Sequence, residues 1–350
     1  MPAKACTLSF LLLFFLNKTL YGKDAEQVIF MIAKRLMTAT LFILFSFYHN
    51  ASAKAQEEKS SIPIKIIVND WTSQIVHSKI LGHIYESIGY TVEYPFYTVD
   101  KQFGAMNLGW AHIQVEIWEG TMLNAFENVK QKNVVEVGLH PALTREEWWY
   151  PSYVKEVCPG LPDYRALNKC ANLFATPASY GKGVYIGGPW EKPDAKRIKA
   201  LGLDFVIRAA KNSDELTAAL QGAVKNKTPI VMFNWTPNWT DFAHEGEFVE
   251  FPAHETLCES DPKWGINPLL THDCGNPKDG RLFKGAWKGL KEQWPCAYKI
   301  LENIKMTNRM IAEAAFLVDI EHKTHDQAAR IWINRHQDTV KSWIPSSCSH

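Results

Sequence analysis

The chain has 350 residues, of which 38 are Lys or Arg and 37 are Asp or Glu. Because this balance leaves no long-range field of either sign, nucleic acid and anionic membrane surfaces are excluded as expected partners. The length favours two folded lobes with separate cores. The composition also includes 13 Trp, a residue that buries a large area and that presents flat aromatic faces to ligands.

The first 55 residues have the features of a leader that is removed on export. Lys34 and Arg35 precede an apolar run from 36 to 47, and small residues follow at 51–53 and 55, which is the order of a secretory signal peptide. The run is too short to span a bilayer comfortably, so a membrane anchor is the weaker alternative. A second apolar run nearer the N-terminus is redundant if export starts at Met31. We therefore expect Met31 to be the true start and the mature protein to be soluble in the periplasm.

The cysteines predict disulfides. Removal of the leader leaves six of them: Cys158, Cys170, Cys258, Cys274, Cys296 and Cys348. An even number in an exported chain indicates a disulfide framework, and the short spacings pair the first with the second and the third with the fourth. The spacing does not decide the partners of the last two, although they can pair with each other. No CxxC pair or Cys–His cluster has the spacing of a zinc site, so no metal site is predicted.

In the first part of the chain, expected strands alternate with helices. A helix follows Thr72 and Ser73, which can cap it, and Gly89 ends it. A second helical stretch covers 122–130. The expected strands are 64–69, 92–97, 113–118 and 134–139.

A second alternating set follows, and together the two sets predict an α/β fold. Its expected strands and helices are 184–186, 192–201, 204–207, 213–225 and 230–234. The apolar faces of the later stretches 306–317 and 328–332 need a sheet to cover, so they should pack back on the first set. We predict one lobe from residues 62–150 and 285–345, and a second from 151–284.

A long loop interrupts the second set. Between Phe251 and Arg281 the pattern of strands and helices fails, and two of the cysteines lie inside this stretch, which predicts a stapled loop or hairpin. Glu259, Asp261 and Asp273 make calcium conceivable in the Cys258–Cys274 loop, although the spacing is not that of an EF-hand.

Enzyme signatures are missing from the sequence. His244 and His254 are each followed by Glu, but the fourth residue after each is Phe248 or Cys258 and not the second His of a zinc protease. No GxSxG, phosphate loop or dinucleotide fingerprint is present. We therefore expect a binding protein and no catalytic residues.

One enzymatic alternative remains open. Glu116, Glu146 and Glu147 offer paired carboxylates that can act on a glycoside, with Trp faces stacking on sugar rings. The alternative function is therefore a secreted carbohydrate-binding or carbohydrate-active protein.

Several tryptophans stand at the ends of expected strands, where ligands of open α/β sheets usually bind. A quaternary or trimethylated nitrogen offers no hydrogen-bond donor, so a site that desolvates it relies on cation–π attraction from several rings. The tryptophans at such positions are Trp71, Trp118, Trp190, Trp235 and Trp239.

Three stretches resemble the glycine betaine and proline-betaine binding proteins of ABC importers. They are Glu-Ser-Ile-Gly-Tyr-Thr-Val at 86–92, Gln-Val-Glu-Ile-Trp at 114–118 and Ile-Val-Met-Phe-Asn-Trp-Thr-Pro-Asn-Trp at 230–239. The Trp-Thr-Pro-x-Trp stretch is the most specific, and the resemblance covers nearly all of residues 62–344. It implies a two-lobed type II periplasmic-binding-protein fold that closes on a ligand in the interlobe cleft. The implied partners are the membrane permease and ATPase subunits of an importer, and we expect a monomer.

The resemblance also implies site residues. By motif position Trp118 and Trp235 match cage tryptophans, and Trp190, in Gly-Gly-Pro-Trp, matches the cage member that begins a second-lobe helix. Trp71, in Asn-Asp-Trp-Thr-Ser-Gln, resembles the branch that binds choline or trimethylamine N-oxide. The pair Trp148 and Trp149 resembles that branch too, and we include Trp149 in the expected cage.

One departure from the family pattern bears on the ligand. Betaine binders hold the ligand carboxylate with a His four residues after the first cage Trp, and Met122 stands at that place here. Acids near the expected cage, with Glu116 as the chosen candidate, suit a cation or an N-oxide able to share a proton. The expected ligand is therefore a methylated ammonium compound (glycine betaine, choline or trimethylamine N-oxide), with choline or the N-oxide binding more tightly than glycine betaine.

Overall fold

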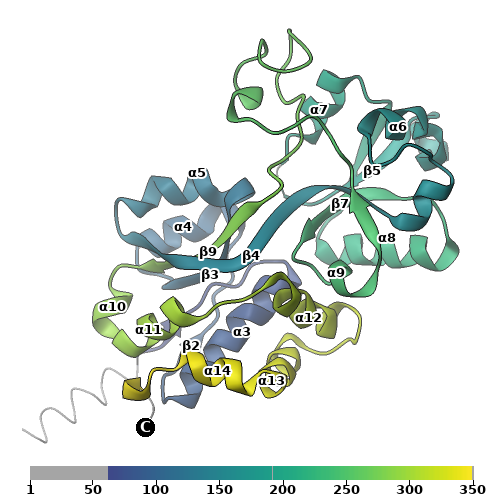
Figure 1. Ribbon diagram of the computed structural model, residues 1–350. Helices are drawn as coiled ribbons and strands as arrows, with labels where there is room; N and C mark the ends of the chain where they lie inside the picture. Colours follow the sequence, from purple (N-terminus) through teal and green to yellow (C-terminus); the bar gives the residue numbers. More distant parts are fainter. Residues whose placement is uncertain (1–61, 191, 349–350) are drawn as a thin grey trace, which may run out of the picture. The chain divides into compact units, whose positions relative to one another are not determined.

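The computed structural model describes residues 62–190 and 192–348 (Figure 1). The predicted leader, with its signal peptide and the start at Met31, lies outside the described residues. The described residues from 63 onward form one compact unit by their contacts. The division of this unit into lobes at residues 150 and 285 stays a prediction.

The strands form two sheets. A small parallel sheet pairs β1 with β2, and a seven-stranded sheet has the order β3-β9-β4-β7-β5-β6, with β8 paired to β4. The bounds are β1 (Ile64–Lys65), β2 (Val92–Glu93), β3 (Ile113–Trp118), β4 (Val134–Pro151), β5 (Gly183–Gly187), β6 (Phe205–Ala209), β7 (Val231–Thr236), β8 (Gly246–Phe248) and β9 (Gly280–Trp287).

Strand β4 is much longer than the expected 134–139, because it changes partner along its length. Up to Thr144 it pairs with β9, and from Arg145 onward it pairs with β7 (Figure 1). The pairing with β9 shifts register between Leu139 and Leu143, on either side of Pro141, which has no N–H for a ladder bond. This one strand therefore links the β3-β9 part of the sheet to the β7-β5-β6 part.

The helices fill the connections between strands and the C-terminal part of the chain. The α-helices are α3 (Thr72–Ser87), α4 (Val99–Asn107), α5 (Glu119–Lys130), α6 (Tyr164–Lys169), α7 (Asp194–Leu201), α8 (Ser213–Asn226), α9 (Thr240–Ala243), α10 (Leu290–Gln293), α11 (Pro295–Asn303), α12 (Asn308–Asp319), α13 (His325–Arg335) and α14 (Gln337–Trp343). The 3-10 helices are η1 (Ser152–Glu156), η2 (Ala171–Phe174), η3 (Pro177–Ser179), η4 (Thr256–Glu259) and η5 (Ser346–Cys348). None of the helices in the described part of the chain combines the length and apolar character needed to cross a bilayer.

The expected cap of α3 was wrong. Thr72 and Ser73 lie inside its first turn, and Trp71 holds the N-cap position without a side-chain hydrogen bond to the backbone. The two hydroxyls donate instead to carboxylates distant in sequence, Thr72 to Asp319 at 2.7 Å and Ser73 to Glu116 at 3.1 Å. The start of α3 is thus fixed by tertiary contacts.

The C-terminal helices pack mainly on another helix. The expectation that their apolar faces cover a sheet is corrected, because α12 and α13 lie against α3 (Figure 1). Trp332 of α13 is fully buried there, and its indole N–H donates to the carbonyl of Met310 at 3.0 Å. Helix α3, covered in this way, carries Trp71 at its N-terminus.

The described residues contain three disulfides. Cys158 pairs with Cys170, and Cys258 with Cys274, as the spacings predict. The third joins Cys296 at the start of α11 to Cys348 near the C-terminus. The second one closes a loop within residues 251–279, which contain no strand and whose one helix is η4 (Figure 1).

Candidate functional site

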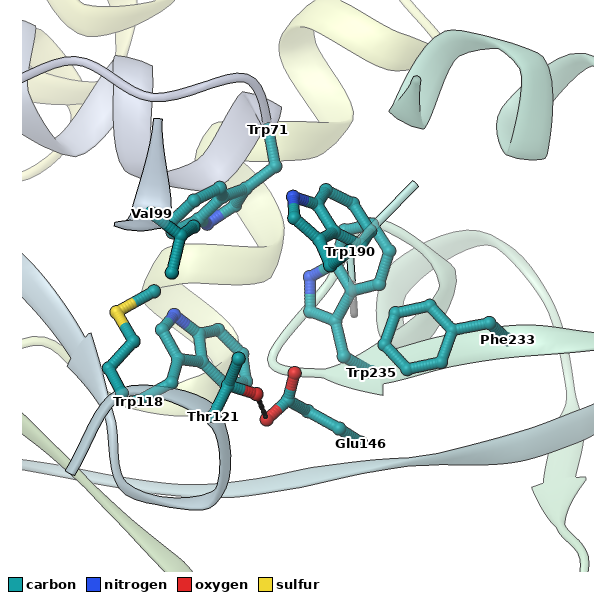
Figure 2. A pocket seen from close by; sticks show the side chains of 9 residues that line it. Trp71, Val99, Trp118, Thr121, Glu146, Trp190, Phe233 and Trp235 are labelled. Atoms are coloured by element: carbon teal, nitrogen blue, oxygen red, sulfur yellow. Dashed lines mark hydrogen bonds between the residues drawn. The ribbon is translucent and has the colours of Figure 1, made fainter. Parts of the chain in front are cut away.

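Aromatic side chains line a cavity whose empty space of about 320 Å³ includes open solvent (Figure 2). Its walls are formed by Trp71, Val99, Trp118, Thr121, Met122, Glu146, Trp190, Phe233 and Trp235.

Ends of secondary-structure elements position these side chains. Trp71 precedes α3, and Trp118 ends β3 at the point where α5 begins. Trp190 follows β5, whereas Trp235 lies on β7, two residues after Phe233. Because side chains two residues apart on a strand share a face, Phe233 and Trp235 reach the cavity together.

The rings stand at large angles to one another. Trp190 is edge-to-face with Trp71, with ring centroids 6.3 Å apart, and edge-to-face with Trp235 at 5.4 Å. Phe233 lies 5.7 Å from Trp235 at a smaller angle of 35°. Rings at such angles present faces and edges from several directions to a shared space (Figure 2).

The four indole N–H groups fall into two classes. The Trp71 N–H donates to Glu116 at 3.2 Å, and the Trp190 N–H donates to Asp70 at 3.1 Å. Trp118 and Trp235 are 3% and 8% exposed, and their N–H groups are buried with no acceptor among the described residues. A buried donor without a partner is costly, and a ligand oxygen in the cavity is one acceptor that can supply the missing bond.

One carboxylate reaches the cavity wall, and it is paired. Glu146 lies opposite Trp235 in the β4–β7 ladder. The ammonium of Lys192 is 2.6 Å from its Oε1, and the hydroxyl of Thr121 donates to its Oε2 at 2.5 Å. The charge of Glu146 is therefore balanced where the ligand would sit.

The cavity brings together four of the expected cage residues: Trp71, Trp118, Trp190 and Trp235. Two other expected site residues lie outside its walls. Trp149 is 4% exposed and packs against Gly246 of β8. Glu116 is fully buried and reaches the site only through its bond to Trp71.

Two further candidates from the sequence belong to the protein interior. Trp148 stacks on Tyr185, with centroids 3.8 Å apart, and donates its N–H to Asp194. Trp239, 2% exposed, donates its N–H to Thr217. Both tryptophans are core residues outside the cavity.

Glu147 has a structural partner. Its carboxylate binds the guanidinium of Arg197 at 2.6 Å and also accepts from the backbone N–H of Asn276 at 2.8 Å. Burial raises the pKa of Glu147, and Arg197 opposes that rise. Glu147 therefore does not supply the free negative charge near the cage that the sequence suggested.

The sequence reasoning missed Phe233, Val99, Lys192 and Asp70. Phe233 has a readable signal, since its spacing from Trp235 on a strand puts both on one face. Val99 belongs to α4, which was not among the expected helices. Lys192 and Asp70 act through pairs with Glu146 and Trp190, more than 40 residues away in sequence, so no local pattern identifies them.

No metal cluster is visible within residues 62–190 and 192–348, where no group of three or more His, Cys, Asp or Glu side chains is placed to hold an ion. In the Cys258–Cys274 loop, Asp273 accepts from the N–H of Asn267 at 2.6 Å and Glu259 lies beside His254. Calcium binding by this loop stays an untested prediction.

Comparison with known proteins gives a consistent result. The family model for the substrate-binding domain of ABC-type glycine betaine transport systems matches residues 62–335. A trimethylamine N-oxide-binding protein from Pelagibacter ubique is 34% identical over 320 residues, which cover 89% of this chain and 97% of that protein. Among solved structures, a lactococcal protein complexed with glycine betaine is 20% identical with a TM-score of 0.60, covering 81% of this chain and 99% of its own. A choline-binding protein of an ABC transporter is 15% identical with a TM-score of 0.61, covering 80% and 91%.

Proposed function

The chain belongs to the family of substrate-binding domains of ABC-type glycine betaine transport systems, and on that premise we propose that its own ligand is trimethylamine N-oxide. It is a ligand-binding transport component with the two-lobed type II periplasmic-binding-protein fold, and it is not an enzyme. The choice that the sequence left open, between a transport protein and a sugar-active protein, is answered by the family. Proteins of this family work with a permease and an ATPase.

The aromatic walls support a methylated ammonium ligand. Trp71, Trp190 and Trp235 offer ring faces and edges within a small cavity, and ring faces attract an N-methyl cation that water no longer covers. The choice of a methylated ammonium ligand rests on the expected match of these tryptophans to the family's cage.

We choose the N-oxide among the methylated ammonium compounds because of the two unpartnered indole N–H groups. Trp118 and Trp235 each have an indole N–H that can donate to an oxygen of the ligand. In trimethylamine N-oxide a negatively charged oxygen is bonded directly to the methylated nitrogen, so one small molecule satisfies both the rings and the donors. Charge-assisted hydrogen bonds of this kind are roughly twice as strong as neutral ones.

The charge balance of the walls also supports a neutral dipolar ligand. Because Lys192 neutralises Glu146, the cavity wall itself offers no unpaired acid to a net cation such as choline. Glycine betaine brings a carboxylate with two oxygens, and the Met122 thioether in the wall is not a donor for it. The relative that is 34% identical is by name a trimethylamine N-oxide-binding protein.

We further propose that the protein acts in the periplasm after removal of the predicted signal peptide. Three disulfides support an oxidising location, since such bonds persist outside the cytoplasm. Family membership supports the same side of the membrane, where a substrate-binding component meets its importer.

Calorimetry on the mature protein, starting at Gln56, tests the proposal. The N-oxide should bind at least about tenfold more tightly than glycine betaine or choline. Trp118→Phe, which keeps a ring and removes the N–H, should weaken the N-oxide about tenfold and leave tetramethylammonium, which has no oxygen, nearly unchanged. Tight binding of glycine betaine without detectable binding of the N-oxide would refute the ligand while leaving the transport function standing.

A further inference from the structure

Glu116 is a buried carboxylate directly beside one wall of the cavity. It lies in β3, all six residues of which are buried, and its own exposure is 0%. Its Oε2 accepts from the indole N–H of Trp71 at 3.2 Å and from the hydroxyl of Ser73 at 3.1 Å. Trp71 therefore has Glu116 bound at its indole nitrogen and also lines the cavity.

Within the described residues, the one basic group within ion-pair distance of Glu116 is His77. The Nδ1 of His77 is 3.3 Å from Oε1 of Glu116, whereas its Nε2 is buried without a partner. Because a carboxylate oxygen accepts, the Nδ1–H of His77 donates to Glu116, and a proton on Nε2 would have no acceptor.

His140 and Lys284 are further ionisable groups in this region. The His140 ring lies 4.9 Å from the His77 ring; its Nδ1 accepts from the N–H of Met306 at 3.1 Å, so its Nε2–H donates to the carbonyl of Val115. His140 is thus a neutral ring as well. Burial holds the pKa of His140 well below its usual range, and Lys284, which donates to three backbone carbonyls, adds to this effect.

An unneutralised buried charge is expensive, and in Glu116 it is held only by hydrogen bonds. We infer that Glu116 is a specificity-determining residue that does not touch the ligand: its charge, placed behind Trp71, favours positive charge in the cavity. The inference rests on the proposed function. Its effect should follow the charge of the ligand: largest for a net cation, smaller for a dipole whose nitrogen faces Trp71, and absent for an uncharged molecule.

Three probes of nearly the same shape separate these cases: tetramethylammonium, trimethylamine N-oxide and tert-butanol. Glu116→Gln keeps an oxygen that can accept from Trp71 and removes the charge. We expect it to weaken tetramethylammonium about tenfold or more, to weaken the N-oxide by a smaller factor, and to change tert-butanol by less than about twofold. Glu127→Gln, an equal charge change on the exposed side of α5, should alter none of the three.

The outcomes distinguish the inference from the proposed function. Titration of the wild-type protein with the three probes tests the function, and the ratio of variant to wild-type affinity tests Glu116. An equal loss of affinity for all three probes would mean that Glu116 only orients Trp71. No loss of affinity for any probe would mean that the charge of Glu116 does not affect binding. Either result overturns the inference. If the Gln variant does not fold, Glu116→Met removes the charge with an apolar chain of similar size, and the same ordering is expected.

Discussion

The ammonium of Lys192 lies 2.6 Å from Oε1 of Glu146 and 2.6 Å from the hydroxyl of Thr121, which itself donates to the same carboxylate. The three side chains form a closed group at the cavity wall, with the Lys and Glu side chains 10% and 15% exposed. An ion pair so poorly exposed to water is weakly screened by salt. It therefore sets the charge that a ligand meets at this wall.

Removal of Lys192 should shift the preference of the site towards cations. In Lys192→Met, Glu146 keeps its bond from Thr121 and loses its counter-charge, so the affinity for choline should rise about threefold to tenfold. The affinity for the N-oxide should change less, because it carries no net charge. Calorimetric titration with both ligands measures the ratio. Lys155→Met breaks an exposed pair with Glu247 and serves as control; an unchanged ratio in Lys192→Met would contradict the prediction.

Truncation of the cage should weaken binding while truncation of the core should not. Trp118→Ala, Trp190→Ala and Trp235→Ala should each remove about 1–2 kcal/mol or more of binding free energy, which is about tenfold or greater in affinity. The Phe variants should lose less of the ring contribution. Trp332→Ala, in the core between α12 and α13, should lower the melting temperature and leave the affinity of the folded protein unchanged. An equal loss of affinity from Trp332→Ala would show that cage and core have been confused.

The sequence predicts the bounds of a strand or helix well where they do not depend on pairing with a second, distant element. Strand β3 was predicted with its observed bounds, because Ile113, Val115 and Ile117 alternate with polar residues as in a strand. Strand β4 was not, because its continuation past Pro141 depends on pairing with β7, about 90 residues later. The C-terminal helices show the same limit, since an apolar face does not tell whether a sheet or α3 will cover it.

Of the five tryptophans expected at strand ends, four line the cavity and Trp239 does not, and the tryptophans within β4 do not line it either. Trp148 and Trp149 are adjacent on β4, and consecutive strand residues face opposite sides, so they cannot both point to one cavity. Their burial against Tyr185 and Gly246 follows from contacts with β5 and β8 that no local pattern shows. The charge of the site was also misjudged, because the partners of Glu146 and Glu147 are 46 and 50 residues away.

Asp319 should make stability depend on pH. Burial raises its pKa from 3.8 to about 7, with Asp214 adding to the rise and the bond from Thr72 opposing it. Because the folded state binds this proton more tightly than the unfolded state, the contribution of Asp319 to stability is complete below pH 3.8 and is lost as the pH rises to about 7.

Asp319→Asn should remove this dependence while keeping an acceptor for Thr72. Its melting temperature should match that of the wild type near pH 4 and exceed it by about 3–6 °C near pH 8. Thermal unfolding followed by circular dichroism at several pH values measures the difference. Asp338→Asn, at an exposed position of α14, is the control and should follow the wild type throughout. A constant offset of the Asp319 variant at all pH values would argue against the titration.

The disulfides should differ in their contribution to stability. In the loop-entropy picture, the bond between Cys158 and Cys170, 12 residues apart, is worth about 3 kcal/mol. The bond between Cys296 and Cys348, 52 residues apart, is worth about 4 kcal/mol. Replacing each pair by Ala and measuring urea unfolding should therefore show a larger loss for the second pair. Thiol titration of the denatured, unreduced mature protein should find no free thiol; two or more would mean that a bond is absent.

Met122 offers the sharpest test of how the site distinguishes an N-oxide from a betaine. Its thioether is in the cavity wall, and the buried amide of Gln102 donates to the sulfur at 3.5 Å. In Met122→His, one ring nitrogen can accept from Gln102, which leaves the other N–H free to donate to a ligand carboxylate. A hydrogen bond to a charged group is worth about 1.5–3 kcal/mol, so glycine betaine should bind about tenfold or more tightly than it does to the wild type.

The N-oxide should gain little from this change, because in the proposed complex the indole N–H groups of Trp118 and Trp235 already donate to its single oxygen. Met122→Leu is the matched control: it removes the sulfur without adding a donor, and it leaves the Gln102 amide without its acceptor. Calorimetry with both ligands on the two variants separates a donor effect from a change of cavity shape. If His and Leu alter glycine betaine binding equally, the thioether is not what keeps the carboxylate out, and discrimination must come from the size of the cavity alone.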